Sequence, residues 1–425
     1  MRMDWASGLR GRIAAITGPD PDSRLAGATL EALCDRLLSP ASASAKLRTA
    51  SEIHSRFDRM GDESKRAFLL LLAERYTADP ERLALAIARY QLDPGGPQLA
   101  DLHAASEPRR QQILRRLNEV PGGTAMLLAM RTALLRIGRD APGLAALDAD
   151  FAHLFASWFN GGFLALRRLD WSTSGDVLAK LMRYEAVHAI ESWEALRARL
   201  EPGDRRCYAF FHPTPDADPL IFVEVALTAA IPVSIQDILR TDRAPVEPGS
   251  ATTAVFYSIS NCQEGLRGIP FGGPLIKQVM DLLRRELPAL KRAVTLSPLP
   301  GFARWLAAQP EEAGLVAALG QQDWHRDAAL RQPLTQAAAR YLLLAAGRDA
   351  DPVARFHLGN GARVEQLDWL GDTSAKGLRQ SHGMMVNYLY DPAHIDANCR
   401  DYAEQGKIAA SKQVRQLART MRMRR

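Results

Sequence analysis

The sequence predicts an α+β protein of more than one domain, in which an N-terminal all-α helical bundle is followed by an α/β domain. Three observations carry this prediction. The chain has 425 residues, a length typical of roughly two to three domains. Segments with helical periodicity fill its first part, and aromatic and β-branched runs gather after residue 170. We therefore expect a helical domain over residues 1–165 and an α/β domain over 166–425.

Short apolar-periodic segments with start and stop signals predict the helices of the first domain. Asp62 and Ser64 open one helix, and Pro80 stands in the first turn of the next, where no N–H partner is needed. Proline and glycine in 93–97 and 121–123 mark turns. The expected helices are 22–38, 62–77, 80–92, 98–119, 123–138 and 144–159. No repeat period links them, so we expect a compact bundle that makes subunit contacts or supports the second domain.

Strand-like runs alternate with helix-like segments in the second domain, which predicts a sheet covered by helices. The expected strands are Cys207–Phe211, Leu220–Leu227, Thr253–Ile259, Ala293–Leu296, Arg355–Leu358 and Val364–Leu370. The expected helices are 175–184, 191–200, 274–288, 332–346 and 406–420. Asn360-Gly361 lies between the last two strand-like runs, and this dipeptide is typical of a hairpin turn.

Charge and cysteine usage exclude several classes of function. The 54 basic and 48 acidic residues give a net charge of +6, and no basic stripe with interleaved aromatics points to nucleic acid. The four cysteines form no C-x-x-C pair and no cluster with zinc spacing, so free thiols are expected. No apolar run approaches the roughly 18 residues of a membrane span, and the N-terminus has no signal-peptide pattern. We expect no nucleic-acid partner, no membrane and no metal.

A loop containing several glycines lies between the strand Thr253–Ile259 and the helix 274–288. It reads QEGLRGIPFGG over 263–273. A strand, such a loop and a helix N-terminus together present unpaired N–H groups to a phosphate, and Arg267 would add a charge-assisted contact. The spacing fits neither G-x-G-x-x-G nor G-x-x-x-x-G-K-[ST], so a turn that only reverses the chain is the alternative.

Two polar residues in the second half are candidates for a fixed role. Ser297 follows an expected strand and precedes Pro298 and Pro300, so either its hydroxyl is held for a ligand or it bonds its own backbone. No G-x-S-x-G motif occurs, which disfavours hydrolases of that type. His357 lies between apolar residues in an expected strand. It can transfer a proton if it faces a cleft, or it packs in the core.

Other residues compete for the same roles. The histidines that the sequence does not separate from His357 are His188, His212 and His382. Tyr388 and Tyr390, in an Asn-Tyr-Leu-Tyr motif, either close the edge of the core or place a hydroxyl in the site.

Six segments together resemble malonyl-CoA decarboxylase, in the same order throughout and from about residue 170 to 392. They are CYAFFHP, LIFVEVALT, FYSISNCQEGLRGIPFGGPLIKQV, SPLPGFARW, FHLGNGARVEQLDWLGDTSAKGL and GLRQSHGMMVNYLY. Several long segments in order are more specific than any one of the motifs above. The helical first domain agrees with the family in type.

This resemblance implies a second domain similar to the GNAT acyltransferase fold, and conversion of malonyl-CoA to acetyl-CoA and CO2 without a metal or organic cofactor. It implies catalytic roles for Ser297, His357 and Tyr390. The loop that binds the acyl-CoA would correspond to Arg267, Gly268, Ile269, Pro270, Phe271, Gly272 and Gly273. Family members associate as oligomers, commonly tetramers, so a homo-tetramer is expected.

Two departures from the family are visible. Animal members carry an acidic residue where this chain has Pro270, so a catalytic contribution of that acid is replaced or missing here. The chain ends in Met423-Arg424-Arg425, without the peroxisomal tripeptide of some eukaryotic members. The second departure favours a bacterial, cytoplasmic protein.

The residue types fit the chemistry that the resemblance implies. Loss of CO2 leaves a thioester enolate, so the site must stabilise negative charge on the thioester oxygen and then protonate C2. We expect Ser297 to hold the departing carboxylate or polarise the acyl group, and His357 to deliver the proton. Two other functions stay open: a GNAT-type acyltransferase that passes the acyl group to an amine, and a non-catalytic acyl-CoA sensor.

Overall fold

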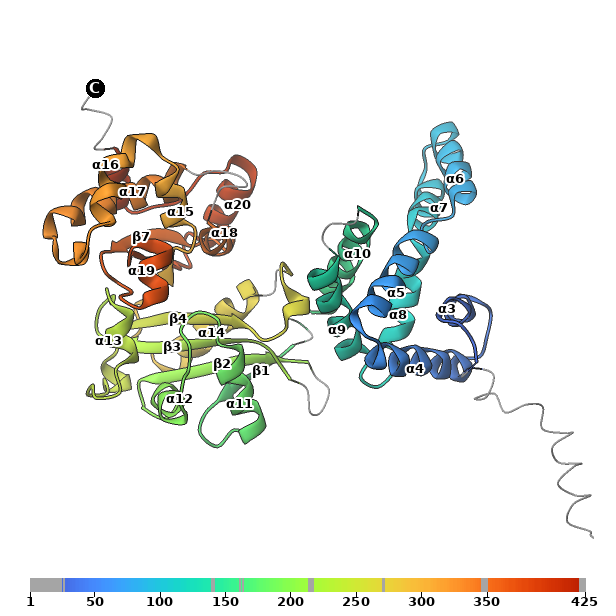
Figure 1. Cartoon of the computed structure of the whole chain (residues 1–425), viewed down its shortest axis with the longest axis horizontal. Helices are drawn as coiled ribbons and strands as arrows, with labels where there is room; N and C mark the ends of the chain where they lie inside the picture. Colours follow the sequence, from blue (N-terminus) through green and yellow to red (C-terminus); the bar gives the residue numbers. More distant parts are fainter. Residues whose placement is uncertain are drawn as a thin grey trace, which may run out of the picture. The chain divides into compact units, whose positions relative to one another are not determined.

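The computed structural model describes residues 25–419, apart from 26, 139–141, 160–161, 163, 213–217, 270–271 and 345–350. The chain divides into two compact units (Figure 1). Met1–Trp158 and Gln263–Ile269 form the first, which we call the helical unit. Phe159–Cys262 and Pro270–Arg425 form the second, the sheet unit.

The helical unit has only helices and turns in its described part, which confirms the all-α prediction. Its apolar stripes meet in a core where Leu33, Leu69, Ile113 and Leu127 are fully buried. Its helices are α3 (Leu30–Leu38), α4 (Ala43–Arg59), α5 (Asp62–Arg75), α6 (Pro80–Leu92), α7 (Gly96–Ser106), α8 (Arg109–Asn118), α9 (Gly123–Ile137) and α10 (Pro142–Trp158), with the short 3-10 helix η2 (Glu264–Leu266).

Two predicted helices in this unit need correction, and one helix was missed. The helix expected over 22–38 begins only at Leu30, with Thr29 as its N-cap. The single helix expected over 98–119 is two helices, α7 and α8, because Pro108 provides no N–H and stands at the N-cap of α8. Helix α4 was not predicted, since its apolar residues are sparse. Ser42 caps it, and Ile53 and Phe57 face the core.

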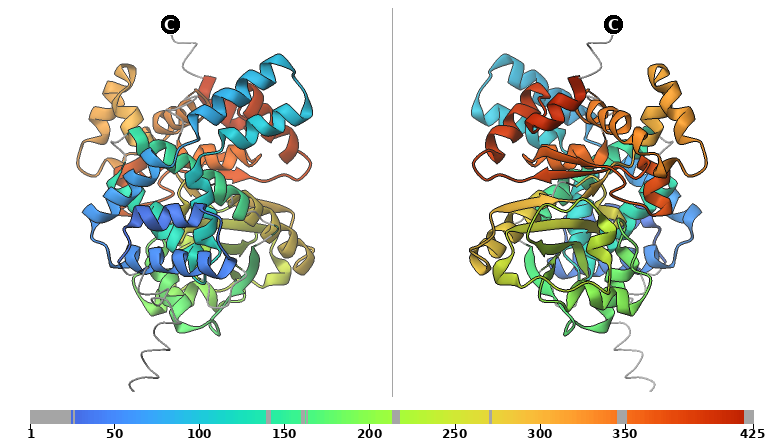
Figure 2. Two further views of the ribbon diagram at one scale, coloured as in Figure 1. Left: turned by 90° about the vertical axis from the view of Figure 1, so that its right-hand side faces the viewer. Right: turned by 90° about the vertical axis from the view of Figure 1, so that its left-hand side faces the viewer.

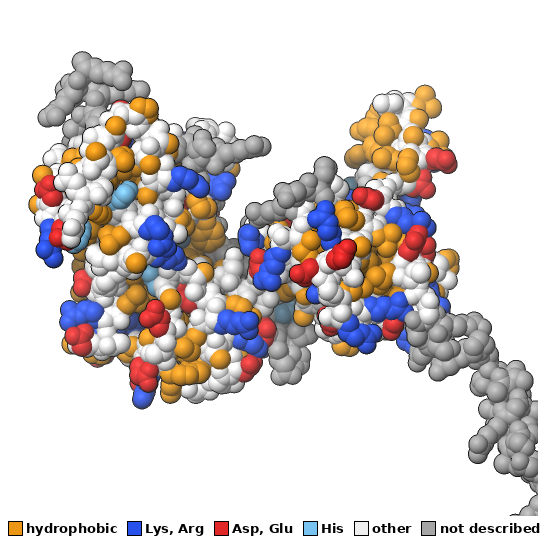
Figure 3. All heavy atoms as spheres, viewed as in Figure 1, with side chains coloured by type: hydrophobic (Ala, Val, Ile, Leu, Met, Phe, Trp, Pro, Cys, Tyr) orange, Lys and Arg blue, Asp and Glu red, His pale blue; other side chains and the backbone are white. Residues whose placement is uncertain are grey.

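Helices α6 and α7 form a hairpin that buries little. Each helix buries one alanine, Ala86 in α6 and Ala105 in α7. Leu92 is 88% exposed and Leu99 is 53% exposed, and Figure 3 shows hydrophobic side chains gathered over this hairpin. The hairpin therefore presents an apolar surface of a kind that often contacts another protein.

The segment Gln263–Ile269 is fixed to the helical unit by Arg131 of α9. The Arg131 guanidinium donates to the carbonyl oxygens of Gly265, at 2.6 Å, and Arg267, at 2.9 Å. A side chain at Gly265 would collide with the carbonyl oxygen of Leu128. Gly268 has a φ of +82°, which a residue with a Cβ rarely adopts. Two of the loop glycines are thus required by the conformation of the chain itself.

The described part of the sheet unit contains a mixed sheet (Figure 2). Its strand order is β1-β2-β3-β4-β5-β8-β6, and β7 pairs with β8. Its strands are β1 (Ala165–Leu169), β2 (Arg205–Phe211), β3 (Pro219–Thr228), β4 (Thr253–Asn261), β5 (Arg292–Thr295), β6 (Ser297–Pro298), β7 (Arg363–Asp368) and β8 (Met385–Leu389). All paired strands are antiparallel except β4 and β5, which run parallel.

Helices cover both faces of this sheet, which confirms the α/β prediction for the second domain. Alternate residues of β2 face opposite sides: Cys207 packs in the cluster formed with α11 and α12, whereas Arg206 pairs with Glu286 of α14. The helices are α11 (Gly175–Tyr184), α12 (Trp193–Leu200), α13 (Ile235–Leu239), α14 (Gly272–Glu286), α15 (Phe302–Ala307), α16 (Ala313–Leu319), α17 (Arg331–Leu344), α18 (Pro352–Gly359), α19 (Ala375–Ser381), α20 (Ile395–Gln405) and α21 (Lys412–Arg419). No helix in the described ranges is long and apolar enough to cross a membrane.

The prediction of a strand over Arg355–Leu358 is wrong, because these residues belong to helix α18. Asp351 caps that helix and Pro352 occupies its first turn, a start signal that outweighs a short apolar run. The hairpin expected at Asn360-Gly361 is therefore wrong as well. This dipeptide ends α18, and Gly361 has a φ of +80°. The helix expected over 406–420 begins only at Lys412. Strands β1, β6 and β8 were not predicted.

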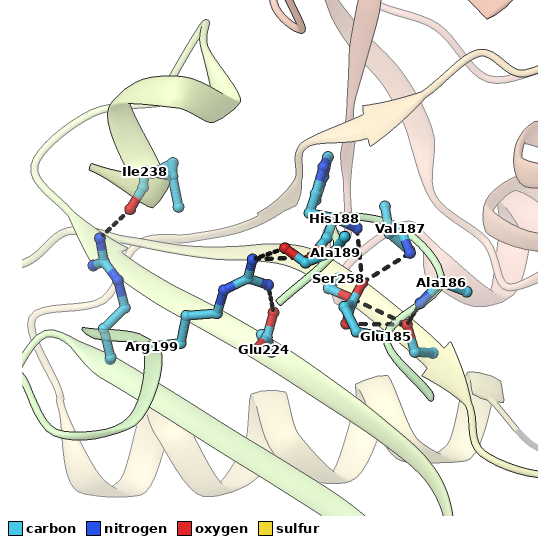
Figure 4. Close-up of polar contacts among 11 residues, drawn as sticks. Glu185, Ala186, Val187, His188, Ala189, Arg199, Glu224, Ile238 and Ser258 are labelled. Carbon is cyan, nitrogen blue, oxygen red and sulfur yellow. Dashed lines mark hydrogen bonds and ion pairs between the residues drawn. The ribbon is translucent and has the colours of Figure 1, made fainter. Parts of the chain in front are cut away.

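A buried carboxylate, Glu185, organises the segment after α11 (Figure 4). One oxygen accepts hydrogen bonds from the backbone N–H groups of Val187 and His188, both at 2.8 Å. The other oxygen accepts from the hydroxyls of Ser258, at 2.7 Å, and Ser260, at 3.2 Å, on β4. This side chain thus joins an irregular segment to the centre of the sheet.

A buried ion pair, Arg199 with Glu224, lies beside Glu185 in Figure 4. The Arg199 guanidinium donates to Glu224 at 2.9 Å and to the carbonyl oxygens of His188 and Ala189. Burial raises the pKa of Glu224 to about 7, and the charge of Arg199 opposes that rise. The Arg199 guanidinium thus joins α12 to β3 and to the segment that Glu185 holds.

Glu185→Ala tests this account of the sheet unit. The change leaves two backbone N–H groups and two serine hydroxyls without their acceptor, so the melting temperature should fall by roughly 5–10 °C. Glu201→Ala is the control, because Glu201 is an exposed carboxylate that pairs with Arg197, and its loss should change the melting temperature far less. Equal melting temperatures for the two variants, measured by calorimetry, would contradict the role given to Glu185.

Candidate active site

Ser297 lies where the sheet separates into two branches. Strands β4 and β5 pair from Thr253 to Phe256, and the Leu296 N–H still reaches the Phe256 carbonyl. The chain then turns to β8, where Ser297 pairs with Val386. Pro298 and Pro300 provide no N–H groups to extend a strand, so the serine stays at this branch point. Its side chain is buried.

His357 projects from the last turn of α18. It is 3% exposed, and its ring stacks on Tyr388 of β8 with centroids 4.6 Å apart. The sequence prediction placed this histidine on a strand, but it is helical. Its neighbour Phe356 contacts the ring edge-on. The imidazole is therefore held by aromatic side chains with little freedom to rotate.

The structure brings Ser297, His357 and Tyr390 together. The Ser297 Oγ lies 3.2 Å from the His357 Nε2, and the His357 Nδ1 lies 2.8 Å from the Tyr390 Oη. The Ser297 hydroxyl also donates to Thr295 Oγ1 at 2.8 Å. Side chains from β5, β6, α18 and the residue that follows β8 thus form one continuous hydrogen-bonded chain in the sheet unit.

Burial decides the protonation states in this cluster. Desolvation lowers the pKa of His357 to about 3, so the imidazole is neutral at physiological pH. Burial also raises the pKa of Tyr390, so its phenol keeps its proton. The Ser297 hydroxyl donates to Thr295, which leaves the Ser297 oxygen to accept from a proton on His357 Nε2, and the Tyr390 hydroxyl then donates to Nδ1. The His357 Nε2–H therefore points at Ser297.

Thr295 was not singled out from the sequence. Its Oγ1 accepts from the Ser297 hydroxyl and, at 3.2 Å, from the backbone N–H of Tyr388. Its carbonyl oxygen accepts from the Asn387 amide at 2.8 Å. The signal was present in the sequence as Thr-x-Ser, because residues i and i+2 of an extended chain share a face.

A cavity of about 330 Å³ adjoins this cluster within the sheet unit. Tyr390 lines it, and so does Gly273 in the first turn of α14. The other lining residues are Ile276, Lys277, Gln278, Met280, Asn360, Ile395 and Cys399. The wall is mostly apolar, with a lysine and an amide at its edge, as in many ligand pockets.

The residues expected to bind acyl-CoA are divided between the two units. Arg267, Gly268 and Ile269 belong to the helical unit, where Arg267 pairs with Glu264 at 2.9 Å and is half exposed. Pro270 and Phe271 lie outside the described residues, as do the last residues of the chain. Gly272 and Gly273 begin α14 in the sheet unit.

The other histidines lie elsewhere. His188 belongs to the segment held by Glu185, and burial lowers its pKa to about 4. His212 packs edge-on against Phe159, and His382 ends α19 with a φ of +49° beside Trp324. Of the histidines weighed from the sequence, His357 is the one that contacts Ser297. In the described part of the chain no group of three or more His, Cys, Asp or Glu residues could hold a metal ion.

Family models match most of the chain. The model of the malonyl-CoA decarboxylase C-terminal domain matches residues 162–425, and that of the malonyl-CoA decarboxylase N-terminal domain matches residues 76–159. The mitochondrial malonyl-CoA decarboxylase of Anser anser anser is 35% identical over 348 residues, which cover 72% of this chain and 69% of the relative.

Solved structures agree over a longer span. The crystal structure of malonyl-CoA decarboxylase from Agrobacterium vitis has a TM-score of 0.86 at 48% identity and covers 92% of this chain and 99% of its own. That from Rhodopseudomonas palustris has a TM-score of 0.84 at 46% identity and covers 94% and 100%.

The protonation state of His357 can be measured directly. In ¹⁵N-histidine-labelled protein its ring should stay neutral, with the proton on Nε2, down to about pH 4, because the pKa is depressed to about 3. An unfolded histidine titrates near 6.5, so the contribution of this burial to stability is full above about pH 6.5 and is lost as the pH falls toward 3. A ring that titrates near 6.5, or that carries its proton on Nδ1, would contradict the assignment.

Proposed function

The chain belongs to the malonyl-CoA decarboxylase family and has the activity of that family, and we propose that it converts malonyl-CoA to acetyl-CoA and CO2 through a thioester enolate that is protonated at C2. The observation that carries this mechanism is the buried chain of Tyr390, His357 and Ser297. These residues supply neutral hydrogen-bond donors and a transferable proton next to a ligand-sized cavity.

The first step needs stabilisation of a developing oxyanion. When the C2–carboxylate bond breaks, its electron pair moves into the thioester carbonyl and CO2 leaves. In the structure the His357 Nε2–H points at Ser297 and the Ser297 hydroxyl donates to Thr295, so we propose that one oxygen of the bound substrate takes over both donors. Fixed donors of this kind contribute about 3–4 kcal/mol each to stabilisation of the transition state, and burial strengthens them.

The second step needs a proton at C2. We assign its delivery to His357 Nε2, while the Tyr390 hydroxyl passes its own proton to Nδ1, so that the imidazole ends neutral. The negative charge of the enolate then rests on Tyr390 until a solvent proton replaces the one transferred. Tyr390 lines the 330 Å³ cavity, and we assign the return of this proton to that side of the cluster. Burial raises the pKa of Tyr390, so its proton returns readily.

The same tautomer disfavours covalent catalysis by Ser297. A serine nucleophile needs a base that accepts its proton, but the Nε2 of His357 already carries one. The Ser297 hydroxyl donates to Thr295 instead. This supports decarboxylation over acyl transfer through an acyl-serine. An acyltransferase would release no CO2 without an acceptor amine, and a sensor would leave malonyl-CoA intact.

The coenzyme A end of the substrate is assigned to the residues expected from the sequence. Helix α14 begins with Gly272 and Gly273, and the N-terminus of a helix has N–H groups without intrahelical partners and a partial positive charge, both of which favour a phosphate. Arg267 adds a cation once its pairing with Glu264 is shared or released. Pro270 and Phe271 complete the proposed set.

We further propose that the chain forms a homo-oligomer, for which the family resemblance leads us to expect a tetramer. We also propose that the protein is cytoplasmic. The exposed apolar surface of the α6–α7 hairpin supports association, because Leu92 and Leu99 are uncovered in the single chain.

The function is tested by incubating the purified chain with malonyl-CoA alone and following acetyl-CoA and CO2 by mass spectrometry. His357→Asn should lower kcat by about 10²–10⁴-fold, since both the donor and the proton are lost, while acetyl-CoA still binds. His103→Asn is the control, because His103 is an exposed residue of α7. Turnover near the wild-type value in His357→Asn would remove this residue from the mechanism.

Thr295 gives a more selective test. Thr295→Val keeps the shape but removes the acceptor of the Ser297 hydroxyl, so kcat should fall roughly 10-fold or more with little change in KM. Thr295→Ser keeps the hydroxyl and should restore most of kcat. If the valine and serine variants turn over equally fast, Thr295 does not orient Ser297.

A further inference from the structure

The carboxylate of Asp351 accepts hydrogen bonds from four donors that belong to three different segments of the sheet unit. The residue is 3% exposed. Its Oδ1 accepts from the backbone N–H groups of Val353, at 2.9 Å, and Ala354, at 3.3 Å. Its Oδ2 accepts from the Gly301 N–H at 3.0 Å and from the Tyr341 hydroxyl at 2.9 Å.

The first pair of contacts fixes the helix that carries His357. Asp351 is the N-cap of α18, and Val353 and Ala354 provide N–H groups of its first turn. The helix has only eight residues, Pro352–Gly359, so its position depends strongly on its ends. His357 is in its last turn. The Oδ1 contacts therefore determine where the imidazole lies.

The second pair of contacts fixes the segment that carries Ser297. Gly301 follows the Ser297-Pro-Leu-Pro sequence and is the N-cap of α15. A Cβ at Gly301 would collide with the Tyr341 hydroxyl, so this backbone packs directly on the tyrosine. Tyr341 belongs to α17 and is itself buried. Oδ2 therefore holds the serine segment against α17.

We propose that Asp351 is a positioning residue that sets the separation of Ser297 and His357, an inference that rests on the proposed function. The two carboxylate oxygens are rigidly joined, so the capped helix and the serine segment are fixed relative to each other. All four donors are neutral groups, and a carboxylate offers acceptors to all of them at once. An asparagine at this position has a single oxygen, so at least one pair of donors loses its acceptor.

The chain contains a matched control for this change. Asp79 also precedes a proline and caps a helix, α6, through Oδ1 contacts with the N–H groups of Glu81 and Arg82. The two aspartates thus make the same capping contacts at the same helix positions. Asp79 is exposed and belongs to the helical unit, whereas Ser297 and His357 belong to the sheet unit. Loss of a cap alone can therefore be measured separately.

The experiment compares wild type, Asp351→Asn, Tyr341→Phe and Asp79→Asn in the full chain. The readouts are kcat and KM for malonyl-CoA, and the stoichiometry and Kd of acetyl-CoA binding. We expect kcat per binding-competent chain to fall about 10²-fold in Asp351→Asn, the loss typical of reacting groups displaced by about 1 Å. In Asp351→Asn, KM and Kd should stay within about threefold of the wild-type values. The fall in kcat should be smaller in Tyr341→Phe than in Asp351→Asn. Asp79→Asn should keep wild-type kcat.

The outcomes separate the inference from the function. If wild type releases no CO2, the proposed function fails, whatever Asp351 does. If wild type is active and Asp351→Asn keeps its kcat per competent chain, or loses only binding-competent chains, the positioning role is overturned. Should Asp351→Asn not fold, Tyr341→Phe decides: a lowered kcat with unchanged KM supports the role, and an unchanged kcat overturns it.

Discussion

The hydrogen bond between a neutral His357 and Ser297 is the interaction on which the proposed active site depends. Burial among aromatic residues keeps the imidazole uncharged, and Tyr390 determines which nitrogen carries the proton. Several features maintain this arrangement. The sheet separates after Phe256 and Thr295, prolines stop the strand at Ser297, and Asp351 holds the serine segment and the short helix α18 together.

The fold class and most of the elements could be predicted because their signals are local. The runs at Leu220–Leu227 and Thr253–Ile259 became the central strands β3 and β4, and Pro80 marked a helix start. The error at Arg355–Leu358 has a physical reason: a four-residue apolar run fits a strand and a buried helix equally well. The preceding Asp351-Pro352 was the deciding signal, and it lay outside the run.

The candidate site could be predicted only in part. Family resemblance identified Ser297, His357 and Tyr390, which lie far apart in the sequence, and the structure brings them into contact. Thr295 could have been found from its position two residues before Ser297 in an extended chain, but Asp351 could not, since its contacts with Gly301 and Tyr341 join segments that no local pattern links. The expected phosphate loop shows a further limit. Gly265 and Gly268 are explained by packing on α9 and by backbone conformation, so glycine content alone does not indicate a ligand.

The central claim is that His357 Nε2 and Ser297 Oγ face the thioester of the substrate together. A crystal structure with a malonyl-CoA analogue that cannot lose CO2 tests this most directly. The account predicts the thioester oxygen at about 2.7–3.1 Å from one or both of these atoms, and C2 within about 3.5 Å of Nε2. A thioester bound in a cavity that neither side chain reaches, or an imidazole turned away from C2, would contradict it.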